Sequence, residues 1–200
     1  QIAALAGEEL PSHFERVSDR RWVGEARDSV RPLFEFVAMK GATYSACWGF
    51  SVDFVPTLRG RRLEWKRTAA KAVRDLTIDP IDESGQAPSW CSFNTDSDPV
   101  QIGRVARDAT TAAVRDFVRV SSRAALVALF EERSKISFER FSLANYLPTD
   151  LAWGLLLVSL GHERDGQAML ARFCDAFAVE SENPILEKAC AEARALARKT

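Results

Sequence analysis

The stretch Tyr44–Phe54, which reads Y-S-A-C-W-G-F-S-V-D-F, decides the fold expected of this chain. Every second residue, from Tyr44 through Trp48 and Phe50 to Phe54, is apolar, and the residues between them are small or polar. Successive side chains of a strand point to opposite faces of a sheet, so this alternation predicts a β-strand. We expect its aromatic face to pack against helices in the core.

Further strands are expected on both sides of this one. The segment Leu33–Lys40 precedes it, and Gly41-Ala42 can form the turn between the two. The short alternation in residues 75–79 predicts a fourth strand. Residues 32–79 therefore read as an antiparallel β-meander.

A hairpin is expected around Gly60, because glycine readily takes the positive φ that tight hairpin turns need. If Arg59 and Gly60 are the two loop residues, Leu58 faces Arg61 and Trp65 lies opposite Phe54. That register keeps the large apolar side chains on one face.

The same register has consequences for the opposite face. It places Lys66 across from Asp53 as an ion pair. It also sets Asp53 and Glu64 on one polar face, which is a candidate floor for a ligand pocket.

Helices are expected over most of the remaining sequence. Residues 1–31 are read as a weakly helical N-terminus, because Trp22, Ala26 and Val30 recur at helical spacing. Residues 80–97, rich in Pro, Ser, Asp and Gly, are read as a long loop. Asp98-Pro99 and Asn183-Pro184 are start signals for helices, and residues 98–200 are expected to hold about five of them.

These patterns together predict an α+β fold in which an antiparallel β-meander of about four strands packs against a C-terminal helical layer. Residues 1–200 are expected to form a single domain. Hydrophobic residues make up 46% and charged residues 28% of the chain, which is typical of soluble globular proteins. No apolar run approaches the roughly 20 residues of a membrane span, so no membrane partner is expected.

Charge is unevenly distributed, although the net charge is only −1. Residues 59–74 carry seven basic residues and one acid, for a net +6, while residues 75–98 carry six acids and no base. Two interpretations stay open: the two stretches neutralise one another, or the basic hairpin binds anionic groups of a partner. The candidate binding residues are Asp53, Arg59, Arg61, Arg62, Glu64, Lys66, Arg67 and Trp90.

The cysteines and histidines show no pattern typical of a metal site, a disulfide framework or a catalytic site. The four cysteines show no C-x-x-C spacing and only two histidines accompany them, so neither a zinc site nor a disulfide framework is expected. Reduced thiols in a bacterial cytoplasm are the default, although the chain begins without Met. Cys174 and Cys190 lie on adjacent expected helices and could meet, and Cys91 is the thiol to test for reactivity.

The leading hypothesis is a non-enzymatic protein that binds another protein through the basic hairpin and the acidic loop. No catalytic residues, cofactor or metal site can be nominated. One alternative is a small metal-dependent hydrolase or phosphate-handling enzyme that uses Asp53, Glu64 or the acids after residue 75. A weaker alternative is nucleic-acid binding by the Arg-rich hairpin, which the near-neutral net charge disfavours.

Overall fold

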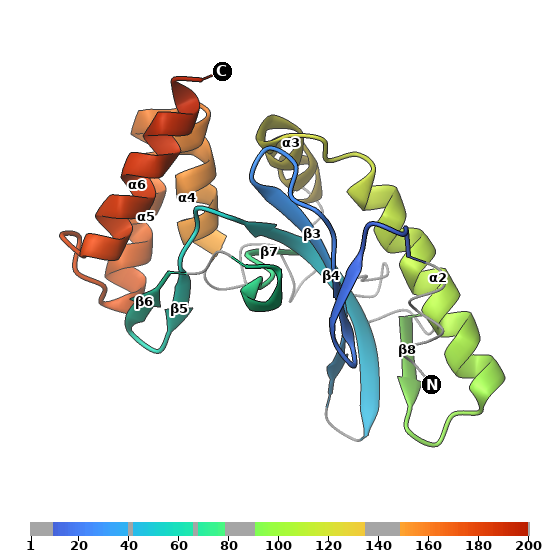
Figure 1. Cartoon of the computed structure of the whole chain (residues 1–200). Coiled ribbons are helices and arrows are strands. Elements are labelled where there is room, and N and C mark those ends of the chain that lie inside the picture. The colour runs from blue at the N-terminus through green and yellow to red at the C-terminus, as the bar shows by residue number, and fades with distance from the viewer. Residues whose placement is uncertain (1–9, 40–41, 66–67, 79–90, 135–148, 200) are drawn as a thin grey trace.

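A computed structural model describes residues 10–39, 42–65, 68–78, 91–134 and 149–199. It contains an antiparallel sheet with several helices, mostly in the C-terminal half, which confirms the predicted α+β class (Figure 1). The strands of the main sheet are β1 (Glu15–Ser18), β2 (Arg21–Val23), β3 (Val30–Ala38), β4 (Thr43–Val52), β7 (Leu76–Ile78) and β8 (Ser92–Asn94). None of the helices in the described ranges is long and apolar enough to cross a bilayer.

The predicted central strand is β4, which pairs with β3 along one edge and with both β7 and β8 along the other. β1 and β2 continue the sheet beyond β3, in the order β1-β2-β3-β4-β7. In the register of β3 and β4, Phe34 lies opposite Trp48 and Phe36 opposite Ala46. The large side chains of both strands therefore gather on one face, as their alternation predicts.

Helix α2 (Pro99–Phe117) lies across this aromatic face (Figure 1). Asp98 caps it, because its side chain accepts a hydrogen bond from the Gln101 amide at 2.8 Å. Phe117 of α2 meets Phe50 of β4 edge to face, with ring centroids 5.7 Å apart. The buried Trp48 indole donates to a buried Asp116 carboxylate at 2.8 Å, which pairs two polar groups inside the core.

The opposite face of the sheet is also covered. Val23, Leu33 and Ala72 form a small second core there, near the 3₁₀ turn η1 (Ala69–Lys71). Glu35 is nearly buried on this face and accepts hydrogen bonds at 2.7 Å from Arg21 and from Arg74. Two guanidinium groups thus compensate one carboxylate.

Two expected segments, the N-terminus and residues 80–97, differ in the structure. The N-terminus is not helical where it is described, because residues 15–18 and 21–23 form β1 and β2. Trp22 and Val30 share a helical spacing, but a turn with positive φ at Asp28 and Ser29 separates them. The expected loop over residues 80–97 contains the strand β8 at its end, and residues 79–90 lie outside the described ranges.

The hairpin also differs from its expected register. Strands β5 (Thr57–Arg59) and β6 (Arg62–Glu64) form a separate two-stranded sheet in which Leu58 faces Leu63 and Arg59 faces Arg62. Gly60, with φ of 63°, occupies the first loop position and Arg61 the second, as in a type II′ turn. Phe54 is buried in the core instead of pairing with Trp65, because the strand β4 ends at Val52.

The other helices in the described ranges are α3 (Arg123–Ser134), α4 (Thr149–Ser159), α5 (Glu163–Phe177) and α6 (Pro184–Ala197). The last three pack side by side next to the β5–β6 hairpin (Figure 1). Helices α4 and α5 pack closely at Gly154 and Gly166. A Cβ atom on Gly166 would lie only 2.7 Å from the Gly154 carbonyl oxygen. Their buried residues and those of the aromatic sheet face form one continuous core.

A buried arginine ties three distant segments together. Arg123, at the start of α3, is 2% exposed and donates from Nε to Asp28 Oδ1 at 3.0 Å and from Nη1 to the Ser159 carbonyl at 2.6 Å. Its backbone amide donates to the other Asp28 oxygen at 2.9 Å. Asp28 sits in the β2–β3 turn and Ser159 ends α4, so this contact joins the sheet to two helices.

Candidate functional site

The β5–β6 hairpin has one apolar and one charged face. Leu58 and Leu63 face each other and pack into the core. Because side chains alternate along a strand, Arg59, Arg62 and Glu64 share the other face. The hairpin is therefore anchored by one face while it presents the other to solvent.

Three arginines gather at the hairpin tip. Arg59 pairs with Glu64 at 3.2 Å while its side chain stays 74% exposed. Arg61 and Arg62 are exposed, and neither forms an ion pair with any described residue. Arg59 and Arg62 lie directly opposite each other, an arrangement of like charges that costs stability.

The base of the hairpin contacts helix α6. The Lys188 ammonium lies over the Trp65 ring, 4.9 Å from its centroid, which is a cation–π contact. Lys188 itself is exposed. We call Arg59, Arg61, Arg62 and Lys188 the basic hairpin surface.

The other predicted site residues do not join this surface. Asp53 follows β4 and forms two hydrogen bonds of 3.3 Å with Arg31, so it is held at the main sheet. Because Glu64 belongs to the separate hairpin sheet, Asp53 and Glu64 do not share the expected pocket floor. Lys66, Arg67 and Trp90 lie outside the described residues.

Two of the described acids in residues 75–98, Asp75 and Asp98, have structural roles. Asp75 is buried and accepts a hydrogen bond of 2.7 Å from the Val52 amide, while Asp98 caps α2. Asp79, Asp82 and Glu83 lie outside the described residues. The described ranges hold no group of three or more residues that could bind a metal ion.

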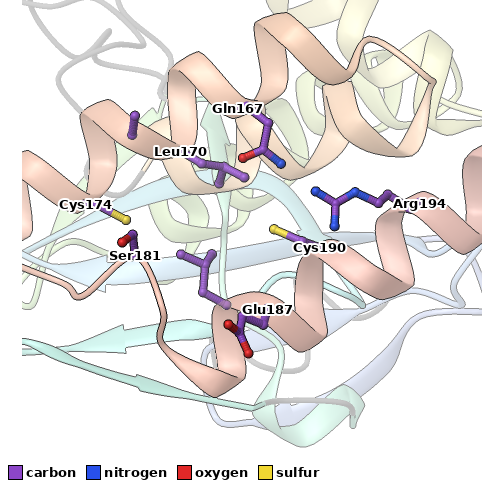
Figure 2. A pocket seen from close by; sticks show the side chains of 9 residues that line it. Gln167, Leu170, Cys174, Ser181, Glu187, Cys190 and Arg194 are labelled. Atoms are coloured by element: carbon purple, nitrogen blue, oxygen red, sulfur yellow. The ribbon is translucent and has the colours of Figure 1, made fainter.

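A hollow of about 480 Å³ lies between α5 and α6, a feature the sequence did not reveal (Figure 2). Its walls include Leu170, Leu186 and the thiols of Cys174 and Cys190. Both thiols are buried and free, and burial raises the pKa of each. Burial therefore disfavours the thiolate form of both side chains, which is the nucleophilic form.

One end of this hollow is polar. Arg194 donates to Glu163 Oε1 at 2.8 and 3.0 Å, and Gln167 donates to the same oxygen at 3.0 Å. The hydrogen bond from Arg194 lowers the pKa of the Glu163 carboxyl. These side chains satisfy one another, and together they brace α5 against α6.

The remaining candidate groups have structural surroundings. Cys91, the thiol proposed for reactivity, is fully buried. His162 occupies the N-cap position of α5 without a side-chain capping bond. His13 lies against Phe14, with ring centroids 5.1 Å apart.

Comparison with known proteins adds no functional information: no family model, curated protein or solved structure matches this chain.

Proposed function

We propose that this chain is a non-enzymatic binding protein whose basic hairpin surface docks on an acidic patch of another protein. The observation that carries the proposal is the pair of exposed guanidinium groups of Arg61 and Arg62, which have no ion-pair partner among the described residues. Arginine is enriched in protein interfaces because its planar fork binds carboxylates at two points.

The hairpin anchors support this proposal. Leu58 and Leu63 bury the rear face of the hairpin and the Lys188–Trp65 contact braces its base. A partner would therefore meet an ordered surface, which lowers the entropy cost of binding. The opposition of Arg59 and Arg62 does not help the isolated chain, and an acidic partner would relieve it.

The test compares two double variants of the full chain in affinity capture from a nuclease-treated lysate of the source cells. R61E/R62E reverses the charge of the hairpin tip. R104E/R164E reverses two exposed arginines on α2 and α5, so it changes the net charge equally. We expect an acidic protein to be captured by the parent chain and by R104E/R164E, and to be lost with R61E/R62E.

The captured protein is then purified and its affinity is measured at several salt concentrations. A partner held by two or three arginine contacts loses affinity moderately with salt. A captured protein that R61E/R62E retains, or no stoichiometric partner at all, contradicts the proposal. Capture from an untreated lysate that nuclease treatment abolishes, with steep salt dependence, assigns the hairpin to nucleic acid instead.

A further inference from the structure

A second concavity lies at the C-terminal end of α2, away from the hairpin. Its volume is about 160 Å³. We call it the α2 cleft. It lies between the last turn of α2, the segment before β1 and the turn that joins β2 to β3.

The interior of the α2 cleft is aromatic. Phe14 stacks on Phe117 with ring centroids 5.4 Å apart, and Phe117 meets Phe50 edge to face. Val118 adds a 74% exposed apolar side chain at the cleft. An apolar cavity of about 150 Å³ is known to hold one benzene molecule, so this volume suits one aromatic ring or branched aliphatic group.

Two opposite charges line the same cleft. Glu25 and Arg27 both contribute to it, both are exposed, and neither forms an ion pair with a described residue. A carboxylate and a guanidinium beside an apolar pit present one group for an ammonium and one for a carboxylate.

The backbone beside these charges is held in place. Asp28 and Ser29 both have positive φ, of 47° and 64°, a conformation that costs non-glycine residues energy and that clusters at functional sites. Arg123 clamps Asp28 through two hydrogen bonds. Arg27 directly precedes this clamped turn, and its amide and carbonyl both bond Val30.

We propose that the α2 cleft binds a free amino acid with an apolar side chain. The side chain of the ligand lies on the phenylalanine rings, its ammonium group faces Glu25 and its carboxylate faces Arg27. A pit of one-side-chain volume that is lined by one carboxylate and one guanidinium assigns this class. A residue inside a peptide carries neither charge on its backbone, and a terminal residue carries only one.

Isothermal titration of the intact chain tests the proposal with L-phenylalanine and L-leucine as probes. Phenethylamine lacks the carboxylate, 3-phenylpropionate lacks the ammonium, and glycine lacks the side chain. We expect one of the two amino acids to bind at least about tenfold more tightly than either analogue, since a hydrogen bond to a charged group contributes on the order of a tenfold change or more. Glycine should not bind.

Two exposed substitutions make the test specific. E25Q should weaken amino-acid binding about tenfold and leave 3-phenylpropionate unchanged, while R27Q should weaken it similarly and leave phenethylamine unchanged. R104Q, a charge removed elsewhere on the surface, is the matched control and should have no effect. Absence of binding at millimolar phenylalanine and leucine, or equal affinity for phenethylamine and phenylalanine, would overturn the proposal.

Discussion

The ion pair between Asp28 and the buried Arg123 allows a quantitative test of how this fold is stabilised. Asp28→Asn is the informative change, because asparagine also tolerates the positive φ of 47° found at this position. The substitution therefore removes the carboxylate charge while the turn keeps its geometry. It leaves the Arg123 guanidinium, 2% exposed, without a countercharge in this contact.

The expected cost follows from burial. Breaking a buried ion pair by removing one partner costs about 3–5 kcal/mol, because the remaining charge stays desolvated. Asp28 is 34% exposed, so water already screens part of the interaction. We therefore expect the lower end of that range, about 3 kcal/mol, for the loss in free energy of unfolding.

The measurement is urea unfolding followed by tryptophan fluorescence, with the variants D28N, R123M, D28N/R123M and R119M compared at constant m value. R119M is the matched control, because Arg119 pairs with Glu132 at the surface with side chains 44% and 56% exposed. It should cost far less than D28N, because water screens an ion pair at the surface. D28N combined with R123M should cost far less than the sum of the single changes, because the double variant no longer buries a lone charge.

A D28N variant that loses no more stability than R119M would contradict the expected role of this ion pair. Additive effects of D28N and R123M would contradict it as well, since the two groups would then act independently. Either result would mean that Arg123 reaches solvent in the folded protein.

Further substitutions test other contacts. Trp48→Phe removes the indole donor of the buried Asp116 carboxylate, and we expect a loss of about 2 kcal/mol in urea unfolding; a neutral result would mean that water enters this site. Gly49→Ala places a Cβ atom 2.1 Å from the Leu76 carbonyl oxygen, so it should lower the free energy of unfolding by about 3 kcal/mol or more by displacing β7. Gly60→Ala is the control, because the space around Gly60 is open, and it should cost only about 1 kcal/mol from the positive φ. Glu163→Gln removes a carboxyl whose pKa is lowered by the hydrogen bond from Arg194. The carboxylate stabilises the fold above its ordinary pKa of 4.5, and this stabilisation is lost as the pH falls through the folded-state pKa. The difference in stability between parent and variant, below about 1 kcal/mol for this half-exposed pair, should therefore vanish in acid, and a difference that persists there contradicts the assignment.

The parts of the fold that sequence predicts are those with long, local signals. The alternation of β4 spans ten residues in the structure, and α2 and α6 begin where Asp98 and Asn183 were expected to cap them. A capping side chain acts on amides two or three residues away, so its signal is contained in a short stretch of sequence.

Short strands and distant partners could not be predicted in this way. β2 has only three residues, too few to show a period of two, and its Trp22 matched a helical spacing by coincidence with Val30. The predicted hairpin register was wrong because two different turns around Gly60 keep Leu58 on the same face of the hairpin. They differ only in whether glycine is the first or second loop residue.

The candidate site was predicted in part. Arg59, Arg61, Arg62 and Glu64 do share one hairpin, because they are neighbours in sequence. Asp53 was misplaced because its partner, Arg31, is set by the pairing of β3 with β4 and not by the hairpin. The α2 cleft joins residues from positions 11 to 120, and no spacing in the sequence signals that meeting.

Buried charged groups with compensating partners stabilise the fold of this molecule, whereas exposed charged groups without ion-pair partners are the proposed binding groups. Inside, Glu35 and Arg123 each have compensating partners, as buried charge requires. On the surface, Arg61 and Arg62 on the hairpin, and Glu25 and Arg27 at the α2 cleft, are exposed and contribute no described ion pair to the fold. Changing the first group should therefore destabilise the fold, whereas changing the second should leave its stability within about 0.5 kcal/mol. A loss of binding in the surface variants can then be attributed to the contact itself, because the folded population stays the same.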